Sequence, residues 1–583
     1  MKKCDSQDLA IKSFFLGPQS ENADWLKAEI DSILEHWFLW RKSSFQEDGT
    51  AISAQDQLDP EFRKKQIELQ QLLRNLQERF KHEIPQYSPR YVGHMYSELS
   101  MPAILGHFLA LIHNPNIIST EAAKVGAHLE EEAIKALGAM FRFPSSTCTG
   151  HFTSGGTVAN IEALWRARYR LDHFLALGSY LNETQNLKMS YVEAAHMGWA
   201  KYEQLIRQYH IPEPILRQHS AVALGPWKTA EIYKRNYGKY YQGAKIFVSN
   251  SKHYSWLKAI SLLGMGDISF EGIDLNAQGQ MKSSDLIEKC NKAFQEDTPI
   301  ALIVSVAGTT ELGTVDPIAE TTEYLKHLRE DKELHLWHHI DAAYGGYFAS
   351  AIKSLDKNTA NDFLAIQHAN SVTLDPHKLG YVPYACGAFL VPNEENNRVS
   401  AFEAKYIQSP QKNIDRWLKT IEGSRAATGA TATWMTVNSI GLHEEGFGKI
   451  LEKTITAKSL LLRDLQASTV NLLPLKNQNL NLVCLVQKDE TNLMLSQTNK
   501  KTETLIDNIN ASGKFIVSKT TLKLKQYQEL ISEHCQDWKL EIDCDELVLL
   551  RMTLMNPFLI TKETKKSYLH ELTETLIHYS KKE

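Results

Sequence analysis

Apolar residues near the start of the chain recur with the spacing of amphipathic helices. A helix is predicted over residues 22–41, with an apolar stripe made of Leu26, Ile30, Ile33, Leu34 and Trp37. Asp59 followed by Pro60 predicts the start of a second helix, whose stripe consists of Leu69, Leu72, Leu73, Leu76 and Phe80. Such a pair cannot bury both stripes by itself, so it must pack on the main body or on a second subunit. We favour the second subunit.

From about residue 125 to residue 400 the pattern changes to continuous apolar runs that alternate with helical segments. The strand candidates are residues 244–250, 301–308, 334–341, 371–375 and 387–391. Apolar strands separated by helices predict an α/β fold with a mainly parallel sheet whose two faces are both covered. Residues 180–240 are polar and rich in tyrosine, and we expect them to form a surface insertion with helical patches.

The rest of the chain completes a three-part organisation. From about residue 430 the pattern is α/β again, with a Lys-rich segment at 499–525 and a strand candidate at 546–554. A chain of 583 residues exceeds a single hydrophobic core. We therefore expect an N-terminal helical dimerisation segment (1–124), a large ligand-binding domain (125–430) and a smaller C-terminal α/β domain (431–583).

Charge and cysteine content narrow the class of partner. The 64 Lys and Arg residues nearly balance the 69 Asp and Glu residues, and no long block has a single sign. Binding of nucleic acid or of a membrane surface through bulk charge is therefore disfavoured, and small molecules are the expected partners. The seven cysteines include no CxxC pair, so we expect neither a disulfide framework nor a metal site. Because no convincing signal peptide or membrane span is present, we expect a cytoplasmic protein.

Two candidate ligand-binding features lie between a predicted strand and a predicted helix. The loop of Ser154, Gly155, Gly156 and Thr157 precedes a helix, so its free backbone N–H groups and the positive helix end would suit a phosphate. The alternative is an ordinary glycine turn. His253 follows the strand candidate at 244–250, where an imidazole can stack on a flat ring or transfer protons. A structural or merely exposed histidine is the alternative.

Two more features follow later strands. Asp341 ends an apolar strand and precedes small residues, so its carboxylate would suit a pyridinium nitrogen; the alternative is a helix N-cap. Lys378 lies in an apolar setting that would favour the neutral amine needed for a Schiff base; the alternatives are exposure to solvent or pairing with Asp375. Together the four features describe a site for pyridoxal phosphate.

The sequence resembles the group II pyridoxal-phosphate-dependent amino acid decarboxylases over residues 80–445, with a weaker match near 545–558. The matching stretches include "TSGGTVANIEALWRAR", "SKHYSWLKA", "AGTTELGTVDPI", "HIDAAYGG" and "DPHKLGYVPYACGAFLV". Within this family it is most similar to bacterial tyrosine decarboxylases, through "GHMYSELSMPA" and "EGSRAATGATA". The resemblance implies the type I, aspartate-aminotransferase-like fold, with a seven-stranded sheet and the pyridoxal phosphate site in the 125–430 domain. It also implies a homodimer with the active site at its interface.

The resemblance implies roles for individual residues. Lys378 would form the Schiff base, Asp341 would bind the pyridine nitrogen, and His253 and Ala343 would contact opposite faces of the ring. Phosphate contacts would come from the 154–157 loop, with His377, Thr309 and Thr310 nearby. A mobile lid would occupy residues 403–420. Tyr384 would be the acid that protonates the substrate carbon, with Tyr406 in the lid as the second choice.

The substrate is the least determined part of the prediction. His94 resembles the residue that faces the substrate side chain in tyrosine decarboxylases, and it could hydrogen-bond a phenol or be structural. Arg90 and Arg551 could instead bind an acidic side chain. We expect decarboxylation of an aromatic, tyrosine-like amino acid, with an acidic amino acid as the alternative. A carbon–carbon lyase of the sphingosine-phosphate type and a non-enzymatic binding protein are two further classes, which the sequence favours less.

Overall fold

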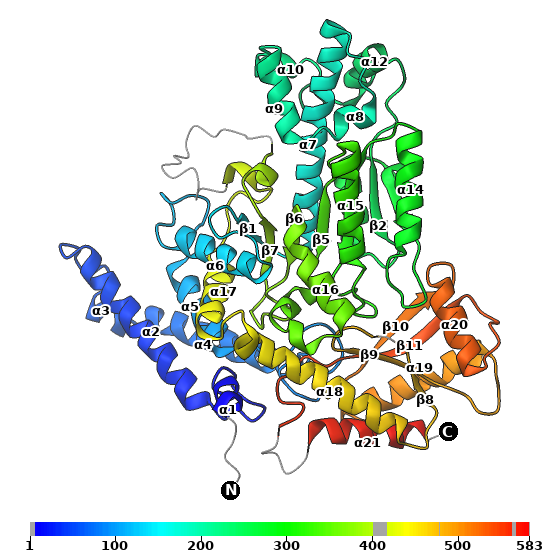
Figure 1. The fold of residues 1–583 in the computed structure, drawn as a ribbon. Coiled ribbons are helices and arrows are strands. Elements are labelled where there is room, and N and C mark those ends of the chain that lie inside the picture. The colour runs from blue at the N-terminus through cyan, green and yellow to red at the C-terminus, as the bar shows by residue number, and fades with distance from the viewer. Residues whose placement is uncertain (1–5, 400–416, 477, 562–566, 582–583) are drawn as a thin grey trace.

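The structure is a computed structural model that describes residues 6–399, 417–476, 478–561 and 567–581 (Figure 1). Most of the predicted lid, together with Tyr406, lies outside these residues. Within the described helices, none combines the length and the apolar character that a bilayer span requires.

A seven-stranded sheet forms the centre of the larger body of the molecule. Its strand order is β1-β7-β6-β5-β4-β2-β3. The strands are β1 (Thr149–Thr153), β2 (Lys245–Ser249), β3 (Phe270–Ile273), β4 (Ile300–Val306), β5 (His338–Asp341), β6 (Ser371–Leu374) and β7 (Gly387–Val391). Strands β3, β2, β4, β5 and β6 run parallel, and β7 is antiparallel to both of its neighbours. The expected mainly parallel sheet is confirmed, although β1 and β3 were not among the strand candidates.

Alternating side chains on the central strands explain why both faces of this sheet are covered. Ile246 and Val248 of β2 point into a core shared with α7 (Gly156–Gln185) and α13 (Ser255–Leu262). Phe247 lies between them and points into a separate core with α14 (Ser283–Gln295) and α15 (Ile318–Lys332). Because adjacent residues of a strand face opposite sides, a continuous apolar run requires helices on both faces. Helix α16 (Lys357–Ala365) lies alongside α15.

The tyrosine-rich stretch is more deeply integrated than the expected surface insertion. It folds into short helices at the far end of α7, namely α8 (Tyr191–Ala195), α9 (Gly198–Gln208), α10 (Glu213–Leu216), α11 (Ala221–Leu224) and α12 (Pro226–Tyr237) (Figure 1). Tyr191 and Tyr233 are each only 1% exposed and belong to the core that covers α7. The prediction of a surface insertion was wrong because these tyrosines supply buried aromatic area as well as a polar hydroxyl.

The C-terminal part builds a second, antiparallel sheet of order β10-β11-β9-β8. Its strands are β8 (Leu472–Pro474), β9 (Leu482–Gln487), β10 (Ser518–Lys523) and β11 (Glu546–Thr553), packed with α18 (Lys449–Gln466), α19 (Leu495–Ala511), α20 (Gln528–Trp538) and α21 (Tyr568–Ser580). The expected α/β character of this part is confirmed. The domain boundaries stay a prediction, since α17 (Thr428–Ser439) packs on α5 (Met101–His113) and α6 (Gly126–Met140).

The N-terminal helices are α1 (Ser6–Lys12), α2 (Ala23–Ser44), α3 (Ala54–Leu58) and α4 (Pro60–Phe80). Asp59 caps α4, because its Oδ1 accepts the backbone N–H of Glu61 at 2.8 Å. Neither α2 nor α4 contains a buried residue. On α4, Leu72 is 69% exposed and Phe80 is 62% exposed. The apolar stripe of α4 is therefore uncovered on the single chain, whereas the predicted stripe of α2 is half-buried.

Candidate active site

A cavity of about 300 Å³ opens at the carboxyl ends of β4, β5 and β6. Its lining includes all the residues expected to hold the cofactor: Ser154, Gly155, Gly156, Thr157, His253, Thr309, Asp341, Ala343, His377 and Lys378. Thr310 lines it as well. Segments separated by more than 200 residues in the sequence thus meet at one edge of the sheet, where open α/β sheets bind ligands.

The glycine-rich loop leads directly into α7. The helix begins at Gly156 with Gly155 as its N-cap, and its 30 residues place the positive end of a long helix dipole at the cavity. A Cβ on Gly156 would lie 2.9 Å from Asp375 Oδ2, so a side chain at this position would displace the carboxylate. The Ser154 N–H donates to Glu422 Oε2 at 3.1 Å. This loop therefore already binds an anionic oxygen.

Asp341 is held by side chains from two different helices. Its Oδ2 accepts Asn160 Nδ2 of α7 at 2.9 Å and Trp256 Nε1 of α13 at 3.1 Å. Among the described residues, its Oδ1 accepts only the Ala343 N–H, at 3.4 Å. The next helical turn begins at Gly345, so Asp341 is not the N-cap that the alternative interpretation required. The carboxylate is fixed in orientation and keeps acceptor capacity on Oδ1.

His253 shares a hydrogen-bond network with Asp341. Its Nδ1 accepts the Ser255 N–H at 3.3 Å and lies 2.9 Å from the Ser255 hydroxyl, which itself accepts Asn160 Nδ2 at 2.9 Å. Burial lowers the pKa of His253, and the opposing effect of the nearby Asp341 carboxylate does not offset it. The imidazole is therefore neutral near pH 7, with the proton on Nε2, and one asparagine orients both groups.

Lys378 differs from the sequence prediction in its immediate surroundings. Its Nζ forms an ion pair with Asp375 Oδ2 at 3.0 Å, and its side chain is 22% exposed. In the chain alone the surroundings of this amine are therefore not purely apolar, and the alternative interpretation, pairing with Asp375, is what the structure shows. The physical reason is local: the Lys378 N–H donates to the Asp375 carbonyl at 3.0 Å, and this turn brings the two side chains together.

Tyr384 and His94 lie outside the cavity lining. The Tyr384 ring packs against His377 with 4.2 Å between centroids. Although Tyr384 is 55% exposed, partial desolvation of its phenol, together with Asp375, raises its pKa to about 12. His94 is exposed, and its backbone N–H donates to the Tyr91 hydroxyl at 3.0 Å. Neither residue is placed directly at the cavity as the sequence prediction implied.

The two arginines considered for an acidic substrate have different surroundings. Arg90 forms an ion pair with Glu571 at 2.7 Å, on the C-terminal part of the molecule. Arg551 is 4% exposed and donates to the Gly93 carbonyl at 3.2 Å and to the Thr310 carbonyl at 2.8 Å. Arg551 therefore connects the segment before His94 to the cavity wall.

Sequence reasoning missed three residues of this site, namely Asn160, Trp256 and Glu422, and it gave the pairing of Lys378 with Asp375 only as an alternative. The sequence could have indicated Asn160, because this residue lies one helical turn after Gly156 and must face the same side of α7. It gives no such indication for Trp256 and Glu422, since their partners Asp341 and Ser154 are 85 and 268 positions away in the sequence.

The residues present fit pyridoxal phosphate. The side-chain-free Gly156 leaves room beside Asp375, and Asp375 Oδ1 is buried without a hydrogen-bond partner among the described residues. The helix N-terminus suits a phosphate, the acceptor capacity of Asp341 suits a ring nitrogen, and the amine of Lys378 suits an aldehyde.

Comparison with known proteins gives the family. The model of the pyridoxal-dependent decarboxylase conserved domain matches residues 52–206 and 231–488. An L-tyrosine decarboxylase of Enterococcus faecium is 26% identical, covering 98% of this chain and 100% of the relative. An aspartate 1-decarboxylase of Aliivibrio fischeri is 29% identical over 58% of this chain and 53% of its own length.

A solved structure gives the same fold. The crystal structure of mouse CSAD has a TM-score of 0.63 at 18% identity, covering 96% of this chain and 99% of that chain. The family match covers well over half of the sequence and includes the glycine-rich loop, His253, Asp341 and Lys378. The expected resemblance is thereby confirmed, and the chain belongs to the pyridoxal-dependent decarboxylases, enzymes that use pyridoxal phosphate to decarboxylate amino acids.

Proposed function

We propose that this enzyme decarboxylates an L-amino acid with an aromatic, tyrosine-like side chain to its amine and carbon dioxide. Membership of the family establishes the type of reaction, and one observation supports the proposed class of substrate. Lys378 is the only Lys or Arg among the described residues that line the cavity, and it is paired with Asp375. An acidic side chain would require a further cation there. The full-length similarity to an L-tyrosine decarboxylase supports the same substrate class.

The proposed cofactor contacts follow the lining of the cavity. Lys378 holds the aldehyde covalently, the 154–157 loop binds the phosphate, and His377 lies beside that loop. His253 and Ala343 contact the two ring faces, Asp341 binds the ring nitrogen, and Thr309 supports the wall. When bound, the cofactor supplies a conjugated ring that delocalises the electron pair left behind by carbon dioxide.

The protein's own contribution is orientation and proton control. Asn160 and Trp256 hold the Asp341 carboxylate, and Asn160 also fixes His253 through Ser255. Prearranged groups of this kind need no reorganisation during the reaction.

Tyr384 is the proposed proton donor. A pKa raised to about 12 keeps its phenol protonated at neutral pH, as a general acid requires. Tyr384→Phe is expected to lower amine formation on the order of 10²-fold while preserving the visible absorbance of the cofactor. Tyr254→Phe, which removes a tyrosine hydroxyl from the cavity wall itself, is the control. Unchanged turnover in Tyr384→Phe would show that another group donates the proton.

His94 is the proposed contact for the phenol hydroxyl of the substrate. Desolvation and the nearby Arg551 lower the pKa of His94, so the imidazole is neutral and can donate or accept a hydrogen bond. His94→Ala is expected to raise the KM for tyrosine about tenfold and to leave the KM for phenylalanine nearly unchanged. An equal effect on both substrates would contradict this assignment.

An acidic substrate is the second candidate, favoured by the similarity to an aspartate 1-decarboxylase and by Arg551 at the Thr310 wall. Carbon dioxide release from Tyr, Phe, Dopa, Trp, Glu and Asp distinguishes the two. Faster turnover of Glu or Asp than of every aromatic amino acid would overturn the aromatic assignment.

A homodimer is the proposed assembly. The apolar stripes of α2 and α4 have no buried member, and a second copy would cover them. Sedimentation equilibrium is expected to give a dimer, and the double substitution Leu72→Asp with Leu76→Asp is expected to give monomers. Gln70→Asp on the same helix is the control that should remain dimeric.

We also propose a cytoplasmic location, because the six described cysteines carry free thiols.

A further inference from the structure

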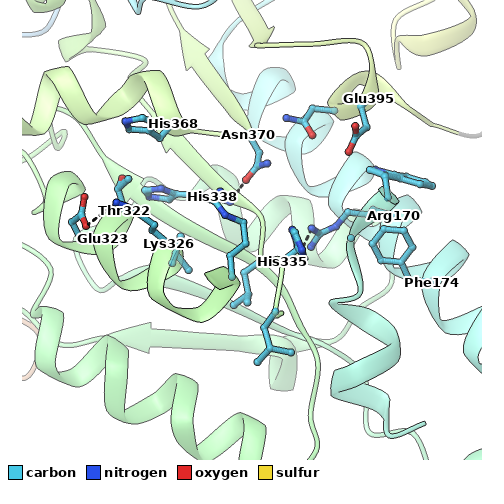
Figure 2. A pocket seen from close by; sticks show the side chains of 17 residues that line it. Arg170, Phe174, Thr322, Glu323, Lys326, His335, His338, His368, Asn370 and Glu395 are labelled. Atoms are coloured by element: carbon cyan, nitrogen blue, oxygen red, sulfur yellow. Dashed lines mark hydrogen bonds and ion pairs between the residues drawn. The ribbon is translucent and has the colours of Figure 1, made fainter. Parts of the chain in front are cut away.

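A second cavity lies at the opposite ends of the strands that build the candidate active site. It measures about 300 Å³ and is lined by residues of α7, α9 and α15 together with the starts of β5 and β6 (Figure 2). Arg170 and Trp199 are buried in its wall, whereas Lys326 and Arg329 are exposed at its edge. In Figure 2, Arg170 lies on one side and Lys326 on the other, with His335 and His338 between them.

The wall of this cavity contains hydrogen-bond donors that have no acceptor. Nε and Nη2 of Arg170, Nε1 of Trp199 and the hydroxyl of Thr322 are all buried without a partner among the described residues. Each of these four atoms can donate a hydrogen bond, and the first three cannot accept one. Buried polar groups are nearly always satisfied in native proteins, so several orphaned donors around one cavity indicate a missing acceptor.

Arg170 is the central group of this set. Its side chain is 5% exposed, and only Nη1 is used, to donate to the His335 carbonyl at 3.0 Å. The rings of Phe174 and Trp337 lie 5.8 and 5.5 Å from its guanidinium carbon. No carboxylate of a described residue forms an ion pair with it. Although burial lowers the pKa of Arg170 to about 10, the group is still charged at neutral pH.

The remaining charges of the lining also favour an anion. Arg170, Lys326 and Arg329 carry three positive charges, against two carboxylates from Glu323 and Glu395. Glu323 lies 4.0 Å from Lys326, and burial raises the pKa of Glu395. Neither carboxylate reaches the orphaned donors of Arg170 or Trp199. Glu395 is close enough to attract the Arg170 charge, but among the described residues no carboxylate oxygen accepts a hydrogen bond from Nε or Nη2 of Arg170.

We propose that this cavity is a binding site, separate from the catalytic one, for a small organic anion that bears a carboxylate or phosphate group. The oxyanion would be the acceptor for Arg170 and Trp199, with Thr322, Lys326 and Arg329 toward the edge. A cavity of this size suits a small metabolite rather than a polymer. Arg170 is ten residues beyond Asn160 on α7, which places it about 15 Å along the helix from the active site.

The first experiment is isothermal titration calorimetry on the holoenzyme, whose own phosphate site is filled by the cofactor. Inorganic phosphate and succinate are titrated separately. We expect one saturable site per chain for at least one of them, and the arm that binds identifies phosphate or carboxylate as the recognised group. Arg170→Met is expected to weaken that binding about tenfold or more. Saturable binding of neither anion would overturn the proposal.

Milder variants keep the test valid if Arg170→Met fails to fold. Trp199→Phe removes the indole N–H together with part of the ring, Thr322→Val replaces the hydroxyl by a methyl group, and each is expected to weaken binding about threefold. Lys326→Met at the edge should weaken it as well, whereas Lys332→Met, on the same helix but outside the cavity, should not. Binding that all these variants leave unchanged would contradict a site in this cavity.

Discussion

The two cavities at opposite ends of β5, one at the start of α7 and one beside its middle, differ in how their central polar groups are bound. At the carboxyl ends of the strands, Asp341 and His253 are bound by side chains of α7 and α13, and Asn160 serves both. At the amino ends, Arg170 and Trp199 are about as deeply buried as Asp341. Their side chains nevertheless keep hydrogen-bond donors that have no acceptor among the described residues. Polar groups whose hydrogen bonds are made keep a fixed orientation, whereas polar groups without partners can still bind a ligand. The same helix thus contributes a prearranged reaction site and a proposed anion site.

The largest expected effect comes from removing the amine of the candidate active site. Lys378→Ala should lower kcat/KM at least about a thousandfold, because the residue proposed to hold the cofactor is lost. Carbon dioxide release measures the loss. Anion binding at the second cavity should be unchanged within error, so a parallel loss of both properties would contradict two independent sites.

Removing the charge of Asp341 should have the next largest effect. Asp341→Asn keeps the size of the side chain but replaces the carboxylate, and kcat is expected to fall on the order of 10²-fold. Asn160→Ala is the matched comparison, because it leaves the Asp341 charge in place but removes a hydrogen bond that orients the carboxylate. For this variant kcat is expected to fall about tenfold. If Asn160→Ala had the larger effect, orientation rather than charge would dominate.

A smaller effect is expected from adding one methyl group to the glycine-rich loop. In Gly156→Ala the new Cβ would lie 2.9 Å from Asp375 Oδ2, which should weaken cofactor binding about tenfold. Gly155→Ala is the control, since its Cβ would lie 3.5 Å from His377, an ordinary contact. Equilibrium dialysis of the cofactor checks both. Equal affinities in the two variants would contradict a close fit at Gly156.

The smallest effect concerns stability at the second cavity. Replacing a buried, unpaired charge by an apolar side chain of similar length is neutral or stabilising, so Arg170→Met should leave Tm unchanged or raise the free energy of unfolding by about 1 kcal/mol. Saturating anion should raise the Tm of the wild-type protein only. A large drop in the Tm of Arg170→Met without anion would show that the structure already satisfies this guanidinium.

The sequence predicted strands well where apolar runs were continuous and poorly where they were not. Strands β2, β4, β5, β6 and β7 follow such runs, but β3 has only one buried residue, Ile273. Strand β1 reads "TGHFT", and its burial depends on distant groups: the Phe152 N–H donates to Glu130 at 2.9 Å. The residues of β1 and its neighbours in the sequence therefore do not indicate that Glu130 is the hydrogen-bond partner.

The candidate site shows the same division. The expected cofactor residues all line one cavity because each lies at the carboxyl end of a strand, and β1, although it pairs antiparallel with β7, runs in the same direction as β6. Asn160 and Trp256 escaped prediction because their contact with Asp341 depends on how α7 and α13 pack on the sheet. Local chemistry also misled: Lys378 was expected among apolar groups, yet the turn from Asp375 supplies a carboxylate.

Borohydride reduction of the holoenzyme followed by peptide mapping tests most directly whether the cavity at the carboxyl ends of the strands is the catalytic one. The reduced cofactor should be found on the peptide that contains Lys378, at one equivalent per chain, and nowhere else. Recovery of the adduct on another lysine, or recovery of no adduct from an enzyme that still releases carbon dioxide, would contradict that assignment.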